Sequence, residues 1–196
     1  MRRDNSHELP IDQVLAQIVT LHREIREFWS EAEGWASVAA SELLSKSRLD
    51  WQVSLSEALR LWFPGDGRRL TDGELILAWA NLGSLVEGTM KLFLSVFYKD
   101  YEKDVDAFKK KDKLLDPDCL TLEQLRQFFK KKDLWSPEWD LYAQQVQARR
   151  NAIHAFQDKD VGNDVEYENA VRRYLVLVRE INSRLPYPDD VYSLKE

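Results

Sequence analysis

The residue types best suited to chemistry stand together in one stretch, QARRNAIHAF, which covers residues 147–156. Within it four residues separate Arg149 from His154, and Arg150 follows Arg149 directly. A histidine can accept or donate a proton near neutral pH, and an arginine can hold a phosphate through a forked pair of hydrogen bonds. In a chain whose apolar patterns are helical, this pairing could form a small RNA-cleaving site that uses no metal.

The helix expected to carry this stretch begins at Ser136-Pro137, where serine can cap and proline suits the first helical position. Its apolar stripe has a charged residue, Arg149, at the fourth of six places. A charge on a core stripe is costly unless it is paired or faces a cleft. One solution is a buried salt bridge, for instance to Glu87, whose loss in Arg149→Ala would cost roughly 3–5 kcal/mol. The other is a cavity or subunit interface where a phosphate reaches Arg149. The apolar members of the stripe are Trp139, Tyr142, Val146, Ile153 and Phe156.

Spacing bears on which arginine lies beside the histidine. Arg150 and His154 are four residues apart, so they share one side of a helix. Arg149 and His154 are about 140° apart on an ideal helix of 3.6 residues per turn. Their convergence requires a distorted last turn, a long reach by the arginine, or a second subunit. Spacing alone therefore favours Arg150 as the neighbour of His154.

Composition indicates a folded protein built from helices. A chain of 196 residues can form one domain with a substantial core. Its 7 glycines and 6 prolines are too few for an architecture of many tight turns, and its 7 tryptophans can anchor helix packing. The lone Cys119 cannot form an internal disulfide or a thiolate metal site by itself, and it fits a reducing compartment. With no clustered His, Cys, Asp and Glu, we expect neither a metal nor a cofactor.

The termini and apolar runs give an expectation about location. No apolar run approaches the roughly 20 residues needed to span a bilayer. The first eight residues, MRRDNSHE, lack the apolar core of a secretory signal. We therefore expect a cytoplasmic protein with no membrane partner.

Charge is distributed unevenly along the chain. The net charge of −6 argues against broad, non-specific wrapping of nucleic acid. The segment from Lys109 to Lys132 nevertheless carries eight Lys or Arg against four Asp or Glu, a local charge of +4. Such runs usually are solvated helix ends, and the alternative is a local RNA-binding surface. The candidate RNA contacts are Lys109, Lys110, Lys111, Lys130, Lys131 and Lys132.

Apolar residues at a spacing of three to four predict an all-α fold, a helical bundle of about four principal helices with shorter accessory helices. The expected helices cover about 11–31, 35–63 with a break near 46–50, 71–101, 121–129, 136–156 and 163–185. Hydroxyl or amide residues three positions before Glu or Gln predict helix caps at Thr71, Thr121 and Asn163. The segment 104–118 is expected to be a loop, and no strand is predicted. His22 lies on the apolar stripe of the first helix, where a histidine is usually a hydrogen-bonded core residue.

The long helix over 71–101 is expected to be touched on two sides, because its apolar face is broad. Glu87 sits at the margin of that face. The whole chain is interpreted as a single domain, with N-terminal helices over about 11–63, a motif-bearing core over about 71–185 and a short polar tail over 186–196. The opposite face of the long helix is predicted to be polar and carries Asn81, Ser84, Gly88, Lys91, Ser95 and Lys99.

The sequence from Arg149 to His154, RRNAIH, resembles the signature of HEPN domains: an arginine, a usually polar residue, a few further residues, then histidine. HEPN domains are all-helical bundles with this motif on a late core helix followed by a closing helix, the order predicted here. The segment over 82–94 also resembles their early core helix. The resemblance covers roughly 71–185 and leaves the N-terminal helices unexplained. In one departure, Arg150 stands where asparagine, aspartate or histidine is most frequent; counting from Arg150 instead leaves only three residues before His154.

The resemblance implies a metal-independent endoribonuclease in which two copies of the motif face each other across a homodimer. His154 would activate the RNA 2′-hydroxyl or protonate the leaving 5′-oxygen, and Arg149 would stabilise charge at phosphorus. The products would carry 2′,3′-cyclic phosphates. Arg150, Asn151 and Glu87 would be supporting groups.

The family also implies a setting and an alternative. A toxin or defence role would suit an acidic protein that binds a protein antitoxin or another regulatory partner. Because many HEPN proteins are inactive, the alternative is a non-catalytic dimerisation module that binds protein or nucleic acid. In that case Arg149 pairs with an acidic residue and His154 is structural.

Overall fold

A computed structural model describes residues 9–34, 36–65, 67–154 and 158–187, and these form an all-α bundle with one short hairpin. The described α-helices are α1 (Ile11–Trp29), α2 (Val38–Lys46), α3 (Leu49–Ala58), α4 (Asp72–Val96), α5 (Tyr98–Lys103), α6 (Leu122–Lys131), α7 (Pro137–Arg150) and α8 (Asp164–Ser183). Short 3₁₀ turns are η1 (Leu59–Trp62), η2 (Pro117–Cys119) and η3 (Asn151–His154), and the hairpin pairs β1 (Lys109–Lys110) with β2 (Lys113–Leu114). The predicted fold class is confirmed.

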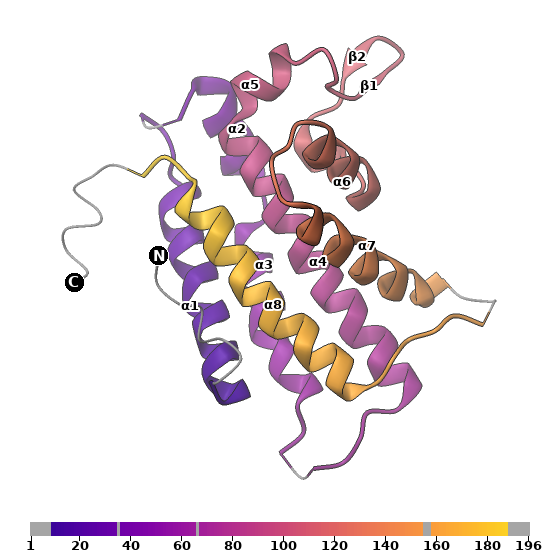
Figure 1. Ribbon diagram of the computed structural model, residues 1–196. Helices are drawn as coiled ribbons and strands as arrows, with labels where there is room; N and C mark the ends of the chain where they lie inside the picture. The colour runs from indigo at the N-terminus through magenta and orange to yellow at the C-terminus, as the bar shows by residue number, and fades with distance from the viewer. Residues whose placement is uncertain (1–8, 35, 66, 155–157, 188–196) are drawn as a thin grey trace.

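Helix α4 is the centre of the bundle. It packs against α2, α3, α7 and α8, and α8 also packs against α1 (Figure 1). Leu82, Leu85, Val86 and Met90 of α4 are completely buried. Buried apolar side chains from α1 through α8 belong to one contiguous core, so the N-terminal helices share the core of the helices that carry the motif. None of the helices in the described ranges is long and apolar enough to cross a membrane.

The face of α4 predicted to be polar is partly buried, and that prediction was wrong in part. Asn81 is 8% exposed; its side chain accepts a hydrogen bond from Trp62 Nε1 at 2.9 Å and donates one to the Leu55 carbonyl at 3.0 Å. At Gly88 an added Cβ would lie 2.2 Å from Gln52 Oε1 of α3. The end of the Gln52 side chain therefore lies directly over Gly88, and an added methyl group would displace it. Helices α2 and α3 with η1 cover this face, so α4 is enclosed on more than two sides.

The predicted helix caps are confirmed at α4, α6 and α8. Each has a reciprocal capping box, in which the cap side chain accepts from a backbone N–H and the third helical residue returns a bond to the cap. Ser136 differs, because its side chain makes no capping hydrogen bond, although Pro137 does occupy the first position of α7. The three boxes are Thr71 with Glu74, Thr121 with Gln124, and Asn163 with Glu166.

The segment predicted as a loop contains the hairpin, so the prediction of no strand was wrong at this place. Lys111 and Asp112 form its turn with φ of 51° and 62°. Positive φ at both central residues is the geometry of the tight hairpin turn that matches strand twist. Glycine and asparagine usually signal this turn, and neither is present. The preceding helix also ends earlier than predicted: α4 stops at Val96, and α5 begins after a break at Phe97.

His22 is a hydrogen-bonded core residue, as predicted. Its side chain is buried, and Nε2 lies 2.7 Å from the Tyr174 hydroxyl of α8. That hydroxyl lies 2.8 Å from Thr89 Oγ1 of α4, and Thr89 in turn donates to the Leu85 carbonyl at 2.9 Å. Burial lowers the pKa of His22 to about 4. This polar chain joins α1, α4 and α8 inside the core.

Candidate functional site

The end of α7 tightens where the motif begins. The α-helix stops at Arg150, and η3 continues it as a single 3₁₀ turn packed against α4. Residues three apart eclipse each other in a 3₁₀ helix, so His154 stands over Asn151. His154 is exposed and Asn151 is half-buried. The last turn of the helix is therefore distorted, as a 3₁₀ turn. Phe156 lies outside the described residues.

Arg149 is paired with acidic residues, but its partners are not the one suggested by the helical stripe. Its Nη1 lies 2.6 Å from Asp160 Oδ1 and its Nη2 lies 3.4 Å from Glu166 Oε1. The Arg149 side chain is 18% exposed, and its guanidinium carbon lies 5.9 Å from the centroid of the Trp79 ring. The suggested pair with Glu87 is absent from the described residues.

The loop over 158–163 covers the solvent side of this guanidinium through Asp160. Asp160 accepts a hydrogen bond from the Gly162 N–H at 2.9 Å, and this bond, together with Arg149, lowers the pKa of Asp160. Gly162 has φ of 71°, and an added Cβ would lie 2.6 Å from Arg149 Nη1. The positive φ favours glycine here, and an added Cβ would also displace the end of the Arg149 side chain.

Exposure of the partner carboxylates changes the expected effect of removing Arg149. The Asp160 side chain is 82% exposed and that of Glu166 is 49% exposed. Both carboxylates remain hydrated without the arginine, so the large cost of orphaning a buried charge does not apply. The stability of Arg149→Ala therefore does not separate a structural role of Arg149 from a catalytic one.

Arg150 holds Glu87 instead. Arg150 Nη1 lies 2.5 Å from Glu87 Oε2, and Lys91 Nζ lies 2.8 Å from the other carboxylate oxygen. The stem of Arg150 crosses α4 at Gly83, where an added Cβ would lie 2.6 Å from Arg150 Cδ. Glu87 is 17% exposed, at the margin of the core as predicted. Its ion pair with Arg150 places Glu87 beside the motif.

The two arginines diverge within one chain. Arg149 turns toward α8 and its preceding loop, whereas Arg150 turns toward α4. Among the described residues no hydrogen bond or ion pair joins His154 to either arginine. One chain therefore presents an exposed histidine and two neutralised arginines at the same end of α7, without assembling them into a single cluster.

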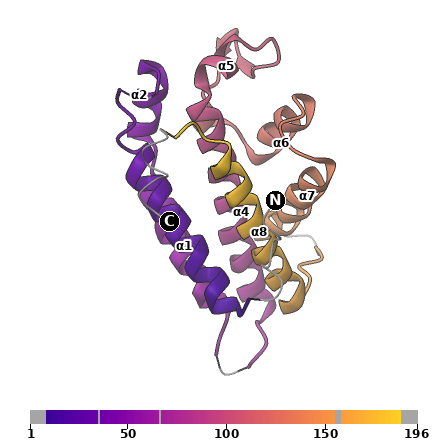
Figure 2. The ribbon, with the colours of Figure 1, turned by 60° about the vertical axis from the view of Figure 1, so that its left-hand side comes forward.

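The basic segment does not join this site. Lys109, Lys110 and Lys111 are exposed on the hairpin, which lies beyond the α5 end of α4, whereas α7 runs toward the other end (Figures 1 and 2). The lysines at the end of α6 are paired with aspartates, so much of the local +4 charge is neutralised. The pairs are Lys130 with Asp140 at 3.3 Å, Lys131 with Asp106 at 2.6 Å, and Lys132 with Asp104 at 2.6 Å and Asp106 at 2.8 Å.

A groove of about 300 Å³ lies between α7 and α8, next to Arg149. Trp79 and Tyr142 lie at its apolar floor, and Arg173 of α8 lines it. Sequence patterns did not single out Arg173, because a cavity arises from the splay of two helices rather than from spacing along one of them. In the sequence, Arg173 shows only as a charged residue next to the apolar stripe of α8.

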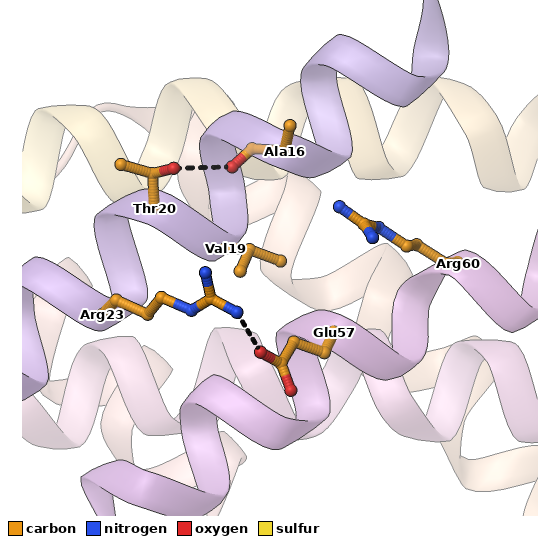
Figure 3. A pocket seen from close by; sticks show the side chains of 6 residues that line it. All are labelled: Ala16, Val19, Thr20, Arg23, Glu57 and Arg60. Atoms are coloured by element: carbon orange, nitrogen blue, oxygen red, sulfur yellow. Dashed lines mark hydrogen bonds and ion pairs between the residues drawn. The ribbon is translucent and has the colours of Figure 1, made fainter.

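A larger cavity of about 480 Å³ lies between α1 and the α3–η1 segment, away from the motif. Figure 3 shows Arg23 reaching across it to Glu57, with Nη2 and Oε1 2.5 Å apart, and Arg60 pointing toward it from the opposite side. The Arg23 side chain is 62% exposed, and its charge is already balanced by Glu57. This cavity contains no residue of the motif.

Within the described ranges, no three His, Cys, Asp or Glu side chains gather closely enough to hold a metal ion. Comparisons with protein-family models, with curated proteins and with solved structures find nothing that matches this chain.

Proposed function

We propose that this chain is a metal-independent endoribonuclease of the HEPN type, with Arg149 and His154 as its catalytic pair. The observation that supports it best is the exposed His154 on a 3₁₀ turn that directly follows Arg149 and Arg150. An exposed imidazole can be reached by an RNA 2′-hydroxyl, and histidines in general change charge near neutral pH. Asn151, three residues before His154 on the same 3₁₀ turn, would act as a supporting group.

The proposed reaction needs only RNA and the protein. The 2′-oxygen attacks the adjacent phosphorus and loses its proton to a histidine acting as general base. The bond from phosphorus to the 5′-oxygen breaks, and that oxygen takes a proton from a histidine acting as general acid. Arg149 stabilises the extra negative charge on the phosphoryl oxygens in the transition state. One product ends in a 2′,3′-cyclic phosphate and the other begins with a 5′-hydroxyl.

The first test is cleavage of a mixed cellular RNA pool by the wild-type protein in EDTA. Because the proposed chemistry uses only protein groups, we expect fragments that end in 2′,3′-cyclic phosphates, and the chelator should not slow their formation. End-group analysis of the fragments gives the result. An intact RNA pool after incubation, or fragments ending in 3′-hydroxyls, would contradict the proposal.

We infer a homodimer because, among the described residues of one chain, no hydrogen bond or ion pair joins Arg149 to His154. If a working site needs both groups around one phosphate, a second copy of η3 has to supply the missing partner. We therefore expect sedimentation equilibrium to show a dimer at micromolar concentration. A monomer throughout that range would exclude a site shared between two chains.

The setting belongs to the proposal as well. A ribonuclease whose activity is not restrained harms its own cell. This suits a toxin or defence protein that a partner inhibits in the cytoplasm. The net charge of −6 would attract a basic protein partner, such as an antitoxin.

A second candidate function is a non-catalytic HEPN-like module for dimerisation or binding. The specific observation in its favour is that both arginines of the motif already hold carboxylates of the same chain: Asp160 and Glu166 for Arg149, and Glu87 for Arg150. Failure of the wild type to cut any RNA, together with a stable dimer, would favour this candidate.

A further inference from the structure

The groove between α7 and α8 combines an apolar floor with polar rims. At the floor, Trp79 is 3% exposed and Tyr142 is 1% exposed. The amide side chains of Gln145 on α7 and Asn169 on α8 lie on the two sides. Each amide offers both a hydrogen-bond donor and an acceptor. Such a lining suits a flat ring with a polar edge.

Arg173 places a positive charge at the α8 side of the groove. Its guanidinium carbon lies 4.9 Å from the Tyr142 ring centroid and 5.8 Å from that of Trp139, and Nη2 donates to the Glu138 carbonyl at 3.3 Å. Among the described residues no carboxylate lies within ion-pair distance of this half-buried group. A partly desolvated charge without a counter-ion favours an anion. The two aromatic rings hold the guanidinium in place before any ligand arrives.

Arg149 at the other end of the groove is different, because Asp160 and Glu166 neutralise it. Glu166 lines the groove as well, next to Arg149. Arg173 is therefore the cation of the groove that has no carboxylate partner among the described residues. A phosphate matches its forked donors. An anionic group at Arg173, joined to a flat ring whose polar edge contacts the amides of Gln145 and Asn169, describes a nucleotide.

We propose that this groove holds one unstacked nucleotide of a single-stranded RNA, with its phosphate on Arg173 and its base between Gln145 and Asn169. This proposal rests on the proposed ribonuclease function, and it places the bound nucleotide beside the cleaved bond, because Arg149 lines the same groove. The volume of about 300 Å³ is at the lower end of the range for small-ligand pockets. It accommodates one splayed base, whereas the bases of a duplex are paired and stacked.

The test measures RNA binding in a His154→Ala background, where the RNA stays intact. Arg173→Met keeps an unbranched stem over Tyr142 and removes the charge. We expect the affinity for a short, fluorescently labelled single-stranded RNA to fall roughly tenfold, the effect of one charged hydrogen-bonded contact. The slope of log affinity against log salt should become shallower by about 0.7, because one phosphate contact is lost.

Arg184→Met is the matched control. Arg184 also lies over an aromatic ring, with its guanidinium carbon 4.7 Å from the Phe93 centroid, and it also donates to a backbone carbonyl, that of Leu134. It lines a different cavity, together with Phe97 and Lys132. We expect this variant to keep the affinity and the salt slope of its parent.

Two outcomes would overturn the groove proposal: an unchanged salt slope in Arg173→Met, or equal binding of a double-stranded RNA of the same sequence. Neither would affect cleavage by the wild type in EDTA, so failure of the groove and failure of the ribonuclease are separate results. If Arg173→Met does not fold, Gln145→Ala replaces it, because Gln145 is exposed. With His154 intact, Gln145→Ala should alter which base flanks the cut, and an unchanged base preference would then count against the groove.

Discussion

His154→Ala is expected to abolish RNA cleavage while leaving the fold intact. General acid–base catalysis by one side chain contributes about 10²–10⁴-fold to a rate, so the residual activity should fall by at least the lower figure. The side chain is exposed on η3, and the helices that hold the core do not depend on it. Initial rates on a defined RNA in EDTA, together with the thermal unfolding midpoint, measure both parts of this prediction.

Two further variants show what the histidine does. His154→Gln keeps a hydrogen-bonding side chain but cannot transfer a proton, so it should be as inactive as the alanine variant; retained cleavage would rule out proton transfer at this residue. Mixing inactive Arg149→Met with inactive His154→Ala should restore part of the activity. A mixed dimer regenerates one intact pair only if the arginine and the histidine of a site come from different chains.

Acidification is expected to destabilise the protein through His22, well before the carboxylates titrate. The folded state keeps the buried imidazole neutral with a pKa of about 4, against an ordinary value of 6.5. The stabilising contribution is complete above pH 6.5, and it is lost as pH falls from 6.5 toward 4, because the unfolded chain binds the proton first. The difference between the two pKa values corresponds to about 3 kcal/mol, of which about 2 kcal/mol is lost between pH 7 and pH 5.

Urea denaturation at pH 7 and pH 5 measures this loss, with His22→Gln as the control. Glutamine can keep a hydrogen bond to the Tyr174 hydroxyl but does not titrate. The hydrogen-bonded neighbours of His22 in the core, Tyr174 and Thr89, remain neutral over this range. Threonine does not titrate, and burial raises the pKa of Tyr174 above its ordinary value. The free energy of unfolding of His22→Gln should therefore depend much less on pH. Equal losses in the two proteins would show that the dependence arises elsewhere.

Local features were predictable from the sequence because their causes are local. The capping boxes depend on residues three apart, and the burial of His22 follows from its place on an apolar stripe. The partner of Arg149 was not predictable in this way. Glu87 pairs with Arg150 rather than Arg149. A shift of one residue turns a helix by about 100°, and the packing of α7 on α4 settles that rotation.

The string FKKKD occurs twice in the chain and adopts two different structures, which local sequence alone does not predict. Its first copy, 108–112, forms one strand and the turn of the hairpin, and its second, 129–133, ends α6. Asp112 and Asp133 both have positive φ, of 62° and 49°. Whether a strand or a helix precedes this aspartate depends on the surroundings, and only tertiary contacts supply them.

Because Arg149 contacts the loop over 158–163, one backbone amide of that loop should respond when a phosphate binds at Arg149. The Gly162 N–H donates to the same Asp160 carboxylate that holds Arg149. A phosphate that draws the guanidinium away changes the charge around that carboxylate and the strength of its bond to the amide. Glycine amides resonate in a sparsely populated region of a nitrogen–proton NMR spectrum, and this chain has 7 glycines. The Gly162 signal can therefore report occupancy of the motif directly, without a label on the RNA or an assay of its products.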